Sequence, residues 1–211
     1  MNNNNSSKQI LLSVLGVAIL VVAVVGISFA AFSYSKTGEV TNTITTGTIT
    51  MSYSEPTNGI NLTDALPITD EAGKALSGNN NVFDFTVSAT IAGTTDISYA
   101  ITAVKDASSN LPDKGVKIYL TSVNGDSETA VFEPKLVSGL STTSNHASGA
   151  PDGQYLLKEG NYTANSKEQY RLRMWVDGNY GQQSDGSNTS EFATQHKYIL
   201  KVNVYGAAKA Q

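Results

Sequence analysis

The side chains that could bind a metal or act as acid–base catalysts are few in this chain. It has two histidines, His146 and His196, and no cysteine among its 211 residues. Disulfides, thiolate catalysis and cysteine-rich zinc sites are therefore excluded. A catalytic zinc ion usually needs three protein ligands, most often histidines with a carboxylate, and the HExxH pattern is absent. We expect two surface histidines, no catalytic residue and no metal site.

Carboxylates gather at two places where oxygen ligands could bind calcium. One group holds Asp64, Asp70 and Glu71, and Asp177 and Asp185 flank a glycine-rich segment. Loops of this kind can bind calcium, but the spacing does not match an EF-hand loop. Asp residues in turns commonly accept hydrogen bonds from their own backbone. We therefore interpret both groups as turn chemistry and expect no cofactor.

Signatures of other enzyme classes and of nucleic-acid binding are also missing. Serines are abundant, but no G-x-S-x-G sequence occurs, and neither a P-loop nor a dinucleotide fingerprint is present. The formal net charge is -4 and the isoelectric point is about 5.1, which argues against a nucleic-acid partner. The sequence therefore predicts a protein that is not an enzyme and does not bind nucleic acid.

A long apolar segment opens the chain. Residues Ile10 to Ala30 carry no charge, and a helix of this length would span about 31 Å, enough to cross a bilayer. Ser28 and Ala30 place small residues at positions -3 and -1 of a signal-peptidase site that precedes Ala31. Two interpretations stay open: a cleaved signal peptide, which we favour, and an uncleaved membrane anchor. Under both, the chain contacts the membrane only through residues 10–30, and for the signal peptide this contact exists only before cleavage.

The rest of the chain shows the two-residue alternation typical of half-buried strands, and no convincing amphipathic helix. Alternation is clearest in residues 82–91, 169–177 and 196–206, and weaker near 49–53, 97–101 and 116–120. Trp175 alternates with the apolar side chains of its segment, and we expect it to be buried nonetheless. Turn-rich stretches separate the segments, and 139–153 and 178–188 are predicted surface loops. The predicted fold is all-β: a two-sheet antiparallel sandwich, jelly-roll-like, preceded by an N-terminal hydrophobic signal or anchor helix.

The residues after the proposed cleavage site resemble the TasA/camelysin family. Members of that family share an apolar signal ending in Ala, a mature start of Ala-Phe or Phe-Phe, and a Gly-Thr-Leu/Ile-x-Leu/Met strand some residues later. This chain has Ala31-Phe32 and then Gly47-Thr48-Ile49-x-Met51. The resemblance is specific for residues 10 to about 53. After them the sequence shares only a general β-strand character with the family.

The resemblance implies a jelly-roll subunit that is exported through a SipW-type signal peptidase and assembles into biofilm-matrix fibres by donor-strand exchange. On this basis residues 1–30 are the signal peptide or anchor, 31–46 an N-terminal donor-strand arm and 47–211 the β-sandwich domain. β-Augmentation draws affinity from main-chain hydrogen bonds and specificity from alternate side chains. The donor side chains would be those at even positions, namely Phe32, Tyr34, Val40 and Ile44.

The expected protein is therefore a secreted structural protein, found outside or on the surface of a Gram-positive-type bacterium. Its expected partners are further copies of itself and other matrix components. The alternative is a membrane-anchored extracellular β-sandwich domain for binding or adhesion, whose loops recognise a surface glycan or a host protein. A third hypothesis, an extracellular hydrolase of the camelysin type, lacks a zinc motif in this sequence.

Overall fold

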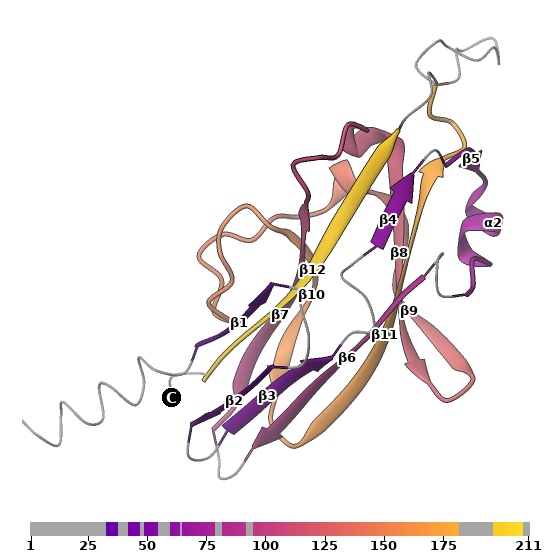
Figure 1. Ribbon diagram of the computed structural model, residues 1–211. Helices are drawn as coiled ribbons and strands as arrows, with labels where there is room; N and C mark the ends of the chain where they lie inside the picture. Colours follow the sequence, from indigo (N-terminus) through magenta and orange to yellow (C-terminus); the bar gives the residue numbers. More distant parts are fainter. Residues whose placement is uncertain are drawn as a thin grey trace, which may run out of the picture.

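The computed structural model describes residues 33–37, 42–46, 49–54, 60–63, 65–78, 82–91, 95–181 and 196–208. The apolar segment and the predicted cleavage site at Ser28, Ala30 and Ala31 lie outside these residues. Within the described part, no helix is long and apolar enough to cross a membrane. The described residues form two sheets of twelve strands in all, one short α-helix and two 3₁₀ turns (Figure 1).

The five-stranded sheet has the order β1-β12-β7-β10, and β4 also pairs with β12. Its strands are β1 (Ser33–Thr37), β4 (Ile60–Thr63), β7 (Ile97–Lys105), β10 (Tyr155–Tyr162) and β12 (Lys197–Ala208). The seven-stranded sheet has the order β2-β3-β6-β11-β8-β9, and β5 also pairs with β11. Its strands are β2 (Asn42–Thr46), β3 (Ile49–Ser54), β5 (Pro67–Ile68), β6 (Val82–Ile91), β8 (Val116–Asn124), β9 (Ser127–Leu136) and β11 (Ser166–Asp177).

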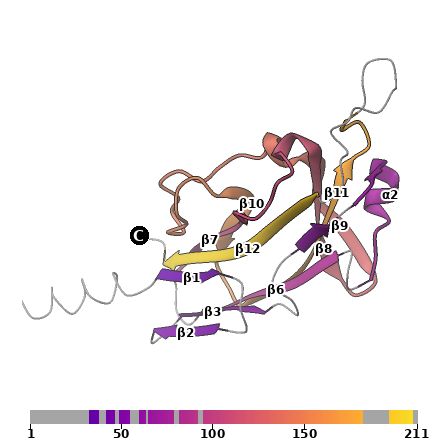
Figure 2. The same cartoon turned by 45° about the horizontal axis from the view of Figure 1, so that its top comes forward.

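The strand order is that of a jelly roll with additions at its N-terminal end. Strands β4-β12-β7-β10 make one four-stranded layer and β6-β11-β8-β9 the other. Figure 2 shows β1 and β12 in one layer, and β2, β3 and β6 in the other. The strand pairs are antiparallel, except for the two-residue pairing of β5 with β11. The expected two-sheet all-β architecture is confirmed.

The alternating side chains build the core between the sheets, as predicted. In β6 and β11 the apolar sets that share a face are buried, and so are those of β8 and β12. Aromatic rings stack there: the centroids of Phe83 and Phe85, both in β6, lie 5.6 Å apart, and those of Phe85 and Tyr170 lie 5.3 Å apart. The second contact joins β6 to β11.

Trp175 is buried on the outer face of the seven-stranded sheet, as expected, because a short helix covers it. This helix, α2 (Asp70–Lys74), begins at Thr69, whose hydroxyl accepts a hydrogen bond from the backbone N–H of Ala72. A Cβ at Gly73 would lie 2.3 Å from the Trp175 ring, so only glycine lets the helix approach this closely. The sequence showed no convincing amphipathic helix after residue 31, and it gave no signal for α2, whose five residues are too few to show helical periodicity.

A cluster of four charged side chains also lies on the outer face of this sheet. Arg171 binds both carboxylate oxygens of Asp84, at 2.7 and 2.8 Å. Arg173 binds both carboxylate oxygens of Glu128, at 2.7 and 3.0 Å, and is only 5% exposed. The hydrogen bonds from Arg173 lower the pKa of Glu128 from 4.5 to about 2, although burial acts in the opposite direction. These pairs link β6, β11 and β9 across the sheet.

Replacement of Gly73 by Ala should push α2 off Trp175, because a rigid indole ring cannot yield to the new methyl group. We expect the free energy of unfolding to fall by about 1–3 kcal/mol, as for other overpacked sites. The fluorescence of Trp175 should shift to the red, and it is the only tryptophan in the chain. Glu71→Ala, at an exposed position of the same helix, is the matched control and should leave both signals unchanged.

Replacement of Glu128 by Gln should remove stability that depends on pH. The pKa of Glu128 is lower in the folded protein than its ordinary value of 4.5, so its contribution is present above pH 4.5 and disappears toward pH 2. We expect Glu128→Gln to cost about 1–3 kcal/mol at pH 7 and to flatten the stability profile between those pH values. Urea denaturation across the pH range measures this. Glu133→Gln, at a side chain that is 67% exposed, should change little.

Candidate assembly site

The outer edge of β12, on the side away from β7, is shared by two short strands that come from different parts of the chain. Strand β4 pairs with residues 197–200 of β12, and β1 pairs with residues 203–207. On the other side of β12, β7 pairs continuously with residues 200–208. Strand β1 therefore completes the part of the edge that the four-residue β4 leaves bare, and we call residues 203–207 the assembly edge.

The chain does not run directly from β1 to β4. After Thr37 it crosses to the seven-stranded sheet, where β2 and β3 form an antiparallel pair at the edge beyond β6 (Figures 1 and 2). It then returns to β12 as β4. Among the described residues β1 pairs with β12 alone. Strand β1 is thus an N-terminal edge strand whose removal would leave the pairing of β4 in place.

Both faces of the assembly edge are covered. Val204 and Gly206 point into the sandwich, and a Cβ at Gly206 would lie 2.1 Å from the sulfur of Met51 in β3. Asn203 and Tyr205 point to the outer face and are also buried. Antiparallel sheets commonly leave one face in water. Here the polar outward residues of β12 are enclosed as well, so only the backbone edge is left for a pairing strand.

The outer cover is the segment 140–154, which we call the covering loop. Ala150 packs with Ala100 of β7 and Tyr205 of β12, and Leu156 borders this small cluster. The loop joins the body through backbone hydrogen bonds, including one from the N–H of Leu156 to the carbonyl of Ser141. The sequence predicted a surface loop over 139–153. The structure confirms the loop and adds that it forms a wall over the five-stranded sheet.

The predicted donor residues fall at two separate edges. Tyr34 lies in β1 opposite Gly206, and Ile44 lies in β2 opposite Met51. Because β1 and β2 belong to different sheets, residues 31–46 do not form one continuous strand with one apolar face, and that expectation is corrected. Phe32 and Val40 lie outside the described residues. The role of these side chains as donors stays a prediction.

The suspected calcium ligands are joined by a lysine. The ammonium of Lys117 lies 2.9 Å from Asp70 and 3.1 Å from Asp177, so it occupies the position between the two carboxylates. Burial lowers the pKa of Lys117, but hydrogen bonds to both carboxylates outweigh it, and the pKa is raised. Glu71 is exposed, and Asp64 and Asp185 lie outside the described residues. Within the described part of the chain, no group of three or more acidic or histidine side chains could hold a metal ion.

The two histidines are half-buried, so the expectation of surface histidines is corrected. The Nδ1 of His146 lies 2.8 Å from the Ser148 hydroxyl, and its Nε2 lies 2.7 Å from the Glu159 carboxylate. The three residue types are those of a hydrolase triad. The Ser148 side chain, however, is part of a local turn and the residue is only 1% exposed, so no substrate can reach its hydroxyl. This contact ties the covering loop to β10.

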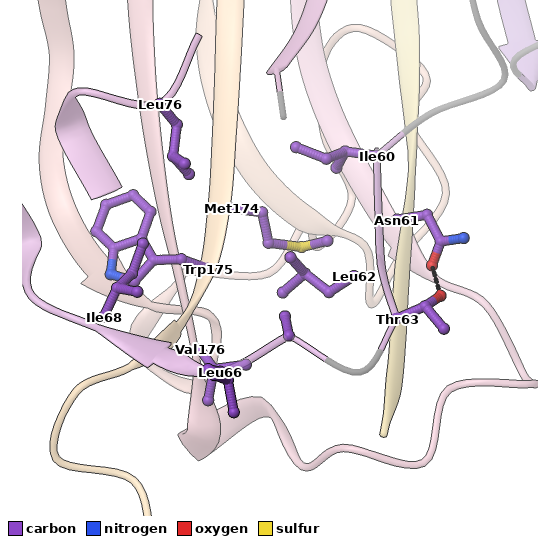
Figure 3. A pocket seen from close by; sticks show the side chains of 11 residues that line it. Ile60, Asn61, Leu62, Thr63, Leu66, Ile68, Leu76, Met174, Trp175 and Val176 are labelled. Carbon is purple, nitrogen blue, oxygen red and sulfur yellow. Dashed lines mark hydrogen bonds between the residues drawn. The ribbon is translucent and has the colours of Figure 1, made fainter. Parts of the chain in front are cut away.

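A cavity of about 230 Å³ opens between β4 and β11, close to α2 (Figure 3). Most of the residues that line it are apolar, among them Ile60, Leu62, Met174 and Val176. Among the side chains drawn, the one hydrogen bond joins Asn61 to Thr63 at the rim. Leu66, which also lines it, is 78% exposed. Sequence reasoning gave no signal for this cavity, because β4 and β11 are far apart in the chain.

Replacement of Gly206 by Ala should disturb the assembly edge from inside. The new methyl group would meet Met51, and we expect a loss of about 1–3 kcal/mol in the free energy of unfolding. Combining it with Met51→Val should cost less than the sum of the two single changes, because the shorter side chain makes room. Chemical denaturation measures all three variants. Gly139→Ala, where a Cβ would meet nothing within 4 Å, is the control.

Comparison with known proteins gives little more. No family model matches this sequence, and no curated protein matches it. Among solved structures, the chain is similar to the crystal structure of the infectious bursal disease virus VP2 subviral particle, with a TM-score of 0.33 and 8% sequence identity. The match covers 75% of this chain and 32% of the viral chain. So weak a similarity carries no functional argument, and the resemblance to the TasA/camelysin family depends on the residues quoted above.

Proposed function

We propose that this protein is a secreted structural subunit that assembles into extracellular fibres of a biofilm matrix by donor-strand exchange. In the fibre, β1 of one subunit lies on the assembly edge of the next. The observation that supports this most is the place of β1: it is the first described strand, it lies at a sheet edge, and it pairs with residues 203–207 alone. The proposed cleavage after Ala30 would leave only two residues before it.

Exchange of β1 needs no new recognition chemistry. The register Ser33 to Ala207 through Thr37 to Asn203 satisfies the same backbone groups whether the two strands belong to one subunit or to two. A strand that leaves its own subunit for the next makes a head-to-tail contact, and such contacts generate open filaments when the rotation does not close a ring. Before cleavage, the same strand is joined to the apolar segment. Processing would therefore release it for exchange.

The resemblance to the TasA/camelysin family enters this proposal through Ala31-Phe32 and the Gly47-Thr48-Ile49-x-Met51 stretch. The jelly-roll strand order agrees with the subunit fold that this family implies. The membrane-anchored adhesion domain remains the alternative. N-terminal sequencing of the cell-associated and secreted protein distinguishes them, since a start at Ala31 supports the fibre subunit and an intact Met1 supports the anchor.

A disulfide between β1 and β12 tests whether the pairing is made between subunits. Ser33 and Ala207 are direct partners, and the chain has no cysteine of its own, so Ser33→Cys with Ala207→Cys introduces one defined bridge. The full chain is expressed in a Gram-positive host and the secreted protein is allowed to form fibres before oxidation. We expect a ladder of covalent oligomers on a non-reducing denaturing gel. Ser33→Cys alone should give no ladder beyond a dimer.

Two further results bear on the same proposal. Oxidation of the double variant before assembly should lock β1 on its own subunit and leave a folded monomer that electron microscopy shows without fibres. A chain that lacks residues 31–37 should also stay monomeric. Fibres whose subunits are cross-linked only internally, or fibres from the deletion, would falsify the exchange of β1.

A further inference from the structure

We propose that Gln154 is a positioning residue for assembly: it holds the outer face of the assembly edge in strand geometry, so that β12 can receive a β1 strand from another copy. This inference rests on the proposed function, because it names the residue that keeps the acceptor strand ready. It concerns the interval in which β1 has left its own subunit and none has yet replaced it. In that interval the outer edge of residues 203–207 has no β-strand partner.

The side chain of Gln154 joins three residues of the five-stranded sheet. Its amide nitrogen donates to the hydroxyl of Tyr205 at 2.9 Å. Its amide oxygen accepts from the hydroxyl of Thr102 at 2.5 Å and from the side-chain amide of Asn203 at 3.4 Å. Thr102 and Asn203 are direct partners in the pairing of β7 with β12. A single side chain thus links the two strands and two successive outward residues of the assembly edge.

Gln154 is itself held in place by Thr143 of the covering loop. The backbone N–H of Gln154 donates to the Thr143 hydroxyl at 3.1 Å, and its carbonyl accepts from the Thr143 N–H at 2.8 Å. The Thr143 hydroxyl donates in turn to the carbonyl of Pro151. Gly149 and Gly153 adopt positive φ, which lets the loop turn back on itself here. The amide group therefore reaches β12 from a fixed backbone.

The buried polar groups explain why this contact matters to the edge. Thr102 and Asn203 are fully buried on a face that would ordinarily be wet. A buried donor that loses its acceptor costs free energy, so loss of the Gln154 oxygen, to which the Thr102 hydroxyl donates, favours opening of the loop or of this part of β12. Strand β12 stays paired with β7 on its other edge, and Val204 packs its interior face. The opening would be local and would leave the core folded.

The test compares Gln154→Ala with the unchanged protein, both secreted from the full chain. Seeded fibre elongation is measured well below the unfolding temperature, and hydrogen exchange at residues 203–205 is measured in monomers. The alanine variant loses the hydrogen bonds to Thr102, Asn203 and Tyr205. We therefore expect roughly tenfold slower elongation and roughly tenfold faster exchange at these amides. Gln154→Glu keeps an acceptor oxygen for the Thr102 and Asn203 donors, and the Tyr205 hydroxyl can turn to donate to the second oxygen, so this variant should restore elongation. Gln169→Ala, at an exposed position of β11, is the matched control.

The outcomes separate this inference from the function on which it rests. Unchanged elongation and exchange in Gln154→Ala would overturn the positioning role, and so would a Gln154→Glu variant as slow as the alanine variant. If Gln154→Ala is not secreted, Tyr205→Phe decides instead, since it removes one of the three hydrogen bonds and keeps the packed ring. Its elongation should be slowed, and an unchanged rate would overturn the inference. Absence of fibres from the unchanged protein would contradict the proposed function, whatever the exchange data show.

Discussion

The backbone edge of β12 is the constraint around which this end of the molecule is built. Strand β12 has twelve residues, whereas β4, its partner on the outer side, has four. The residues beyond β4 are buried from inside by Met51 and from outside by the covering loop. Backbone N–H and C=O groups enclosed in this way must find partners. The N-terminal strand supplies them, and the proposed exchange is a change in which subunit provides that strand.

The additions to the jelly roll follow from this requirement. Strands β1 and β4 act as one interrupted strand along β12, and the β2–β3 pair is inserted between them on the opposite sheet. Each half of the interrupted strand is attached independently. The core pairings are those of β6 with β11, of β11 with β8 and of β7 with β12, and β1 takes part in none of them. A subunit can therefore retain its core while its first strand is elsewhere, which is what a donor-strand fibre requires.

The sequence predicted the strands in which apolar and polar residues alternate, including β12, whose polar outward residues at the assembly edge are buried as well in the structure. The predicted range 82–91 coincides with β6, whereas 169–177 omits the first three residues of β11 and 196–206 omits the last two of β12. Strand β9 was missed because most of its first residues are exposed on both faces, and Pro134 suggests a turn. Strand β10 was missed because a register irregularity between Leu156 and Lys158 breaks the alternation.

Only one of the two strands of the candidate site could be predicted from the sequence. The proposed donor strand could be expected from its position after Ala30. The proposed acceptor edge depends on the pairing of strands about 170 residues apart (Ser33 with Ala207), and no local pattern encodes such a register. Trp175 was rightly expected to be buried, whereas its cover is a five-residue turn. The covering loop could be recognised by its Ser, Thr, Asn and Gly content. The contact of Gln154 with Thr102 could not be predicted, since a lone glutamine in a polar stretch carries no signal.

The antiparallel register of β1 on β12 also has a mechanical consequence. Its five residue pairs run from Ser33 with Ala207 to Thr37 with Asn203. If two subunits joined in this way are pulled apart along the strand direction, the strands lie parallel to the force and the hydrogen bonds between them lie perpendicular to it. The five pairs are then loaded together in shear, instead of opening one after another. A filament joined in this way would be strong in tension for the small area of each junction, and peeling forces perpendicular to β12 would break it far more easily.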